Sequence, residues 1–132
     1  MSLKILLIDD QLGFIDQLRE QLTTLPYSDN IQVIQATNSE EGKEQFINNP
    51  DLDLVVIDVH LGDEDGVKLA REFSTSYRDR LESTKLLMTC TEAPKPLRDE
   101  CKSYDVSGWV LKPIEGKTLY QFIKTHLPHR LV

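Results

Sequence analysis

Residues 54–58, LVVID in one-letter code, constrain the fold of this chain more than any other stretch. Four consecutive apolar residues that run directly into a carboxylate are typical of a central strand in a parallel sheet, where both faces are covered. Residues 5–10, ILLIDD, repeat this design and end in two carboxylates. If the two strands are neighbours, Asp9, Asp10 and Asp58 converge at the carboxyl edge of the sheet, where open α/β folds bind ligands.

Strand-like and helix-like segments alternate along the whole chain. The predicted strands are residues 4–10, 31–36, 53–58, 85–89 and 108–111. The predicted helices are residues 13–25, a segment from Asn38 or Ser39 to about 48, a segment with its inner face from Val67 to Tyr77, and residues 94–104 and 115–127. Five alternating β and α units predict an α/β fold, a doubly wound parallel sheet with helices on both faces.

The order of the predicted strands and helices also constrains the arrangement of the sheet. Right-handed crossovers place the carboxyl ends of all the strands on one side of the sheet. The glutamines in strand 31–36 favour an edge position for it. No internal repeat or flexible linker interrupts the 132 residues, so we expect a single domain over 1–132.

Charge and composition exclude several classes of partner. The net charge is −7, without a Lys/Arg cluster, which discourages direct binding to nucleic acid or to an anionic membrane. No apolar run approaches the roughly 18 residues of a membrane span, and no signal-peptide pattern opens the chain. The two cysteines, Cys90 and Cys101, are too few for a disulfide scaffold or metal site and indicate reduced thiols in a cytoplasmic protein.

Reactive side chains follow four of the five predicted strands. They are Asp9 and Asp10 after the first strand, Asp58 after the third, Thr89 after the fourth and Lys112 after the fifth. Clustered carboxylates repel one another unless a cation holds them, and hard oxygen ligands suit Mg²⁺. The hydroxyl and the amine complement a phosphoryl group. This set predicts a site for an acyl phosphate on an aspartate.

In these residues the chain resembles the receiver domain of two-component response regulators, including chemotaxis-type single receivers. The matching motifs are Asp9-Asp10, Asp58, Asp65-Gly66, Thr89 and Lys112-Pro113, in this order and on the expected elements. The resemblance covers essentially the whole chain, so residues 1–132 are expected to be a single receiver domain. It implies the flavodoxin-like strand order 2-1-3-4-5.

The resemblance also implies a role for each site residue. Asp58 is the expected phosphoacceptor. Asp10 and Asp58 are expected to bind Mg²⁺ directly and Asp9 largely through water, with the backbone carbonyl of His60 completing the protein ligands. Lys112 is expected to pair with the phosphoryl group.

A conformational switch is implied as well. Thr89 is expected to hydrogen-bond the phosphoryl group and to couple its movement to Trp109, shifting the surface of the fourth helix, fifth strand and fifth helix. The family usually has Tyr, Phe or His where this chain has Trp109, so a fixed tryptophan that does not switch is the alternative. The Lys112-Pro113 bond is expected to be cis.

The expected function is therefore phosphoacceptance from a histidine kinase or a histidine phosphotransfer protein, followed by a change in the surface that an unknown downstream target binds. Such a domain is not an enzyme beyond self-catalysed uptake and loss of the phosphoryl group. Three alternatives stay open. The first is a degenerate receiver that binds partners without phosphorylation, which failure to bind Mg²⁺ would favour. The second is a phosphohydrolase with an aspartate nucleophile, which is less favoured because residues 9–11 lack the Asp-x-Asp pattern. The third is a nucleotide-binding fold, which is less favoured because no Gly-rich loop follows the first strand.

Overall fold

The computed structural model describes residues 3–22, 24, 30–92 and 94–128. Its main sheet has five parallel strands in the order β2-β1-β3-β6-β7, where β6 and β7 are the fourth and fifth strands of that sheet along the chain. These strands are β1 (Leu3–Ile8), β2 (Ile31–Ala36), β3 (Leu54–Asp58), β6 (Lys85–Cys90) and β7 (Val106–Leu111). The flavodoxin-like order 2-1-3-4-5 is confirmed, and the partly polar β2 lies at an edge as predicted.

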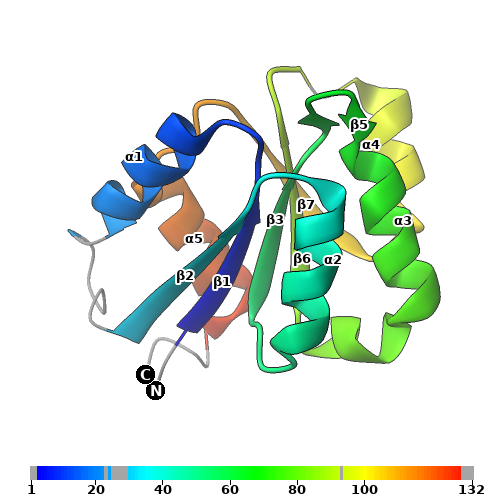
Figure 1. The fold of residues 1–132 in the computed structure, drawn as a ribbon, viewed down its shortest axis with the longest axis horizontal. Helices are drawn as coiled ribbons and strands as arrows, with labels where there is room; N and C mark the ends of the chain where they lie inside the picture. Colours follow the sequence, from blue (N-terminus) through cyan, green and yellow to red (C-terminus); the bar gives the residue numbers. More distant parts are fainter. Residues whose placement is uncertain (1–2, 23, 25–29, 93, 129–132) are drawn as a thin grey trace.

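Helices cover both faces of the sheet, as Figure 1 shows, with α1 and α5 on one face and α2, α3 and α4 on the other. Their bounds are α1 (Leu12–Leu22), α2 (Ser39–Asn48), α3 (Gly66–Ser76), α4 (Lys95–Lys102) and α5 (Gly116–His126). None of the helices in the described ranges has the length and apolar character needed to cross a membrane.

Each face of the sheet carries its own apolar core, because alternate residues of a strand point to opposite sides. Val55 and Ile57 of β3 belong to the core under α2, α3 and α4, whereas Leu54 and Val56 belong to the core under α1 and α5. All five residues of β3 are buried, Asp58 included. Burial of an aliphatic side chain of this size stabilises a fold by about 1.5–3 kcal/mol, so β3 fixes the position of the carboxylate at its end.

The observed element ends differ slightly from those predicted. β1 ends at Ile8 rather than at residue 10, because the Asp9 carboxylate accepts a hydrogen bond from the backbone N–H of Gln11 and turns the chain into α1. The helix predicted for 13–25 is α1, which ends at Leu22. The last apolar residue of the predicted helix, Leu25, lies outside the described residues, as do Pro26, Ser28 and Asp29, which together with Asn30 indicate a turn in the sequence.

Two segments that the sequence predicts as loops contain short regular structure. The loop after Asp58 folds into a small antiparallel hairpin, β4 (His60–Leu61) and β5 (Glu64–Asp65). The polar connection 78–84 contains the 3₁₀ helix η2 (Arg78–Glu82). Segments of two to five residues are too short to give a periodic pattern in the sequence, so they escape prediction.

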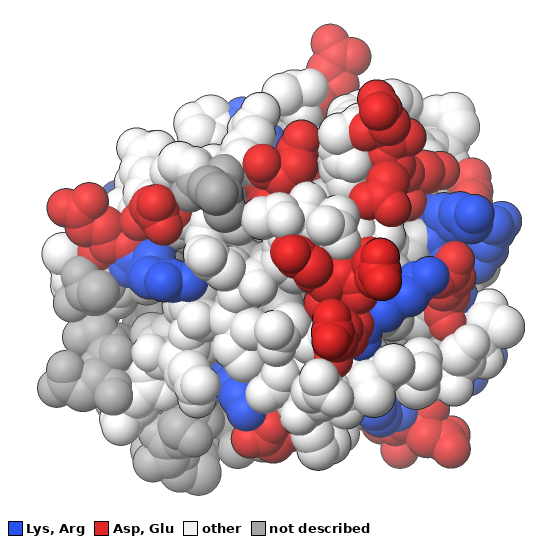
Figure 2. All heavy atoms as spheres, in the orientation of Figure 1, with Lys and Arg blue, Asp and Glu red and all other residues white. Residues whose placement is uncertain are grey.

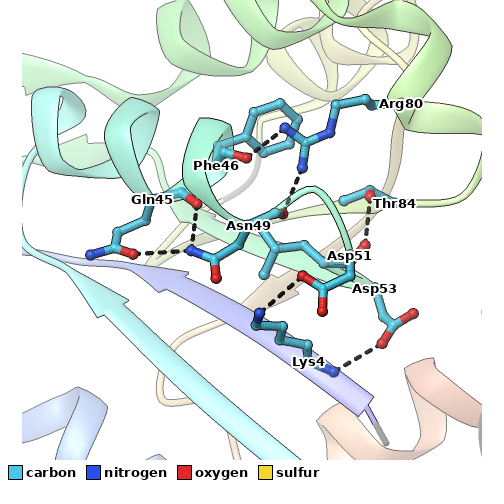
Figure 3. A network of polar contacts seen from close by, with 9 residues as sticks. Lys4, Gln45, Phe46, Asn49, Asp51, Asp53, Arg80 and Thr84 are labelled. Carbon is cyan, nitrogen blue, oxygen red and sulfur yellow. Dashed lines mark hydrogen bonds and ion pairs between the residues drawn. The ribbon is translucent and has the colours of Figure 1, made fainter.

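A polar network closes the amino-terminal edge of the sheet (Figure 3). The backbone N–H of Lys4 at the start of β1 donates to Asp53 (2.9 Å), and the hydroxyl of Thr84 donates to the carbonyl of Leu52 (2.6 Å). Arg80 of η2 donates to the carbonyls of Phe46 and Asn49 at the end of α2. These contacts fix the starts of β1, β3 and β6, at the edge opposite to the carboxylates.

Acidic side chains spread over the face shown in Figure 2, over α2 and the β4–β5 hairpin in particular, with Lys and Arg side chains among them toward α3. The first turn of α2 carries Glu40 and Glu41, whose negative charges interact favourably with the positive end of the helix dipole. This distribution agrees with the net charge of −7 and gives this face no basic surface for a polyanion.

Candidate functional site

Three aspartates meet at the carboxyl edge of the sheet, as predicted. One carboxylate oxygen from each of Asp9, Asp10 and Asp58 lies within 4.8 Å of the other two. They come together because β1 and β3 are hydrogen-bonded neighbours that end at the same level, with Ile8 paired to Ile57 in the register. Asp9 and Asp58 are buried, with only 3% and 4% of their surfaces exposed, whereas Asp10 is exposed.

Lys112 bridges the two buried carboxylates. Its Nζ lies 2.7 Å from Oδ2 of Asp58 and 2.9 Å from Oδ2 of Asp9. The end of β7 holds this side chain in place, because the backbone N–H of Lys112 donates to the carbonyl of Cys90 in β6 (2.9 Å). The Lys112-Pro113 peptide bond is cis, as expected.

The charges in this cluster do not balance, since one ammonium faces three carboxylates. Burial raises the pKa of Asp9, an effect that the close contact with the Lys112 ammonium and the hydrogen bond from the N–H of Gln11 only partly offset. Burial alone would lower the pKa of Lys112, but its hydrogen bond to Asp58 and its close contacts and charge interactions with Asp9 and Asp58 outweigh this, so the pKa is raised and the ammonium is kept charged. The raised pKa of Asp9 shows that the single ammonium does not fully compensate the buried carboxylates.

Oδ2 of Asp9 shows where an additional cation fits. This atom is buried and has an ion-pair contact to Lys112, but among the described residues it has no partner with good hydrogen-bond geometry. An incompletely satisfied buried carboxylate oxygen is costly unless a positive group compensates it. Three convergent carboxylates of this kind, with one open to solvent, form an oxygen donor set that fits Mg²⁺.

Two glycines shape the loop beside the phosphoacceptor candidate. A Cβ on Gly66 would lie 1.9 Å from the backbone carbonyl oxygen of Asp58, so only glycine allows α3 to start this close to β3. Gly62 has a φ of +63° and lies near Asp10. Asp65 caps α3, accepting a hydrogen bond from the N–H of Val67 (2.9 Å).

A pocket of about 280 Å³ opens over the carboxylates. Its lining residues are Asp10, Gln11, Asp58, His60, Gly62, Thr91 and Lys112. The backbone N–H of His60 donates to Oδ1 of Asp58 (3.1 Å), so both oxygens of this carboxylate are held. A tetrahedral oxyanion in this pocket would meet the ammonium of Lys112 and the hydroxyl-bearing side chain of Thr91, which are suitable donors for a phosphoryl group.

Thr89 and Trp109 lie on the neighbouring strands β6 and β7, and neither is among the residues that line this pocket. Thr89 is 1% exposed and pairs with Asp58 in the register of β3 and β6. Trp109 pairs with Met88, one position before Thr89, and its partly buried side chain packs on the core under α4. The two predicted switch residues are thus diagonal neighbours on β6 and β7.

Sequence reasoning missed Thr91, Phe14 and the fold of the loop after Asp58 as parts of this site. Thr91 lines the pocket. Its hydroxyl, just beyond the end of the fourth strand, is a signal in the sequence that could have indicated this position. The ring of Phe14 lies 4.8 Å from Nζ of Lys112. Nothing in the sequence marks a contact between residues so far apart in the chain.

Comparisons with known proteins agree with this geometry. A sequence model described as "Response regulator receiver domain" matches residues 5–124. A CheY-like receiver domain protein from Methanospirillum hungatei JF-1 is similar in structure, with a TM-score of 0.79 and 21% identity over 98% of this chain and 97% of that chain. No match was found among curated proteins.

Two further solved structures share the fold. The chemotaxis protein CheY4 from Vibrio cholerae has a TM-score of 0.78 and 20% identity over 96% of this chain and 100% of that chain. A two-component response regulator from Clostridium difficile has a TM-score of 0.81 and 20% identity over 96% of this chain and 97% of that chain. With the family match over most of its length, the chain belongs to the response-regulator receiver family.

Proposed function

We propose that this protein is a phosphoacceptor receiver that takes a phosphoryl group onto Asp58 from a phosphohistidine of a histidine kinase or a histidine phosphotransfer protein. The observation that carries the proposal is the bridge from Nζ of Lys112 to the buried carboxylates of Asp58 and Asp9, at 2.7 and 2.9 Å. A charged amine held at a buried carboxylate under an open pocket is already placed to donate hydrogen bonds to a phosphoryl oxygen.

In the proposed transfer, a carboxylate oxygen of Asp58 attacks phosphorus, a P–O bond forms and the P–N bond to the donor histidine breaks. The electron pair of that bond stays with the histidine nitrogen. Lys112 then shifts its ammonium from the carboxylate to an oxygen of the phosphoryl group, whose negative charge replaces that of Asp58. The N–H of His60, 3.1 Å from Oδ1 of Asp58, orients the carboxylate.

Mg²⁺ is the proposed cofactor. Asp10 and Asp58 would bind the ion directly, Asp9 largely through water, and the backbone carbonyl of His60 would complete the protein ligands. When bound, the ion would neutralise charge on the carboxylates and on the incoming phosphoryl oxygens. The proposal is supported by the 4.8 Å spread of the three carboxylates and by the incompletely satisfied Oδ2 of Asp9.

The proposed output is a change of surface around α4, β7 and α5, transmitted from Thr89 to Trp109. Within the described part of α4, Cys101 alone is buried, so this helix is weakly anchored to the core. Trp109 lines a groove of about 440 Å³ next to α4, where Lys95, Arg98 and Lys102 also lie. A partner that binds here would sense any movement of Trp109 directly.

Intact mass spectrometry tests the proposal. The protein is incubated with Mg²⁺ and a small acyl-phosphate or phosphoramidate donor, as wild type, as Asp58→Asn and as Asp63→Asn, an exposed loop carboxylate outside the pocket lining. We expect one phosphoryl adduct in the wild type and in Asp63→Asn, none in Asp58→Asn and none after chelation of the metal.

Two results would contradict parts of this function. An adduct that persists in Asp58→Asn would overturn the choice of acceptor. A wild type that neither forms an adduct nor binds Mg²⁺ would refute phosphorylation and favour a receiver that binds partners without it.

A further inference from the structure

Within the described residues, Phe14 is the aromatic side chain whose ring faces the ammonium of Lys112. It lies in the first turn of α1, where its backbone N–H donates to the carbonyl of Gln11 (3.1 Å). Its ring centroid is 4.8 Å from Nζ of Lys112, within the range of a cation–π contact. The Lys112 side chain is only 11% exposed, so this contact lies in a largely dry environment, where cation–π attraction is stronger than at an open surface.

The ammonium of Lys112 is therefore surrounded by three groups from three elements. Asp9 follows β1, Asp58 ends β3 and Phe14 belongs to α1. The two carboxylates hold the ammonium by charge, and both interactions change when Asp58 loses its charge to a phosphoryl group. The ring carries no net charge and belongs to a partly buried side chain packed against the core under α1 and α5, so its contact can persist through the transfer.

We infer that Phe14 is a positioning residue for Lys112 in phosphoryl uptake, an inference that rests on the proposed function. The ring occupies one side of the ammonium, where water would otherwise solvate it, and limits the rotamers of the long lysine side chain. The Lys112 side chain is then already ordered and partly desolvated when the phosphoryl oxygen arrives, so the transfer requires less of both.

The first test measures the rate constant of phosphoryl uptake from a small phosphoramidate by the time course of the mass adduct. We expect Phe14→Leu to lower it about three- to tenfold, because Lys112 must then be ordered and desolvated during the transfer, and Phe14→Tyr to restore it by supplying a ring of the same shape. Phe122→Leu is the matched control, because Phe122 is also partly buried against the same core but has no recorded contact with Lys112. It should match the wild-type rate.

The second test asks whether Phe14 acts through Lys112. In a Lys112→Ala background, Phe14→Leu should cause no further loss of rate, because the group that it positions is gone. Nuclear magnetic resonance gives a readout that is independent of phosphorylation. The ε-methylene protons of Lys112, assigned by their loss in Lys112→Arg, should show an upfield ring-current shift that disappears in Phe14→Leu and remains in Phe122→Leu.

The outcomes separate this inference from the proposed function. A wild type without an adduct overturns both. A phosphorylated wild type overturns the inference alone if Phe14→Leu reacts at the wild-type rate, if Phe122→Leu slows uptake equally, if the loss persists in the Lys112→Ala background, or if the ring-current shift is absent.

Discussion

Arg80 provides a demanding test of how this fold is held together, far from the proposed site. Its guanidinium donates to the carbonyl of Phe46 (2.5 Å) and to that of Asn49 (2.9 Å), and its central carbon lies 3.7 Å from the centre of the Phe46 ring. The other face of that ring stacks on Phe73 at 4.2 Å. One side chain of η2 thus supplies the hydrogen-bond donors that the last carbonyls of α2 lack within their own helix.

Arg80→Met removes these contacts while keeping an apolar side chain over Phe46. Hydrogen bonds from a charged donor contribute about 1.5–3 kcal/mol each, and a cation over an aromatic ring about 0.5–1 kcal/mol. Water can replace part of this because Arg80 is half-buried. We therefore expect the free energy of unfolding to fall by about 2–4 kcal/mol, a large share of the roughly 5–15 kcal/mol of a typical domain.

Urea denaturation followed by circular dichroism measures this loss, with Arg78→Met as the matched control. Arg78 belongs to the same 3₁₀ helix, but its side chain is 67% exposed and its contacts to Asp105 and Ser74 are long, at 3.5 and 3.4 Å. The control should lose less than about 1 kcal/mol, the usual limit for an exposed ion pair. The reasoning is refuted if Arg80→Met loses no more than Arg78→Met.

Three further perturbations test other parts of the structure. Gly66→Ala should destabilise by about 2 kcal/mol or more in the same urea assay, since its Cβ would lie 1.9 Å from a backbone oxygen, whereas Gly13→Ala, with open space around the Cβ, should not destabilise. Gln21→Ala removes the acceptor for the N–H of Gly116 at the start of α5 (2.6 Å) and should cost about 1 kcal/mol by urea titration. Burial raises the pKa of Asp9, so the native state binds a proton on this carboxylate more readily than the unfolded state does. Without Mg²⁺, Asp9→Asn should therefore raise the free energy of unfolding at neutral pH. This gain in stability should shrink as the pH falls through the raised pKa. Thermal unfolding at a series of pH values checks this, and an advantage that grows on acidification would contradict it.

The sheet and the carboxylate cluster were predictable because both follow from local sequence. Four apolar residues before Asp58 specify a buried strand, and the parallel arrangement brings its end beside Asp9 and Asp10. Contacts between distant segments were not predictable. Arg80 reaches Phe46 across 34 residues, and nothing in the sequence near either residue marks the pair.

The same distinction applies inside the site. Lys112 and Thr89 were found because they lie at the carboxyl ends of strands, whereas Phe14 is one apolar residue among several on a helix and could be assigned only to the core. The β4–β5 hairpin was missed because each of its strands has two residues. Side-chain contacts of this kind depend on packing, which the pattern of apolar and polar residues does not specify.

The small number of core contacts made by α4 affects how the sequence of such a protein can change during evolution. With Cys101 as its one buried residue in the described structure, most positions of this helix are free of constraints from the core. Substitutions on its outer side therefore cost little stability and are open to selection for a new partner. The buried strands that carry the carboxylates stay constrained by the core while the outer side of α4 varies, which is one way for this chain to keep the receiver fold at about 20% identity to two solved structures.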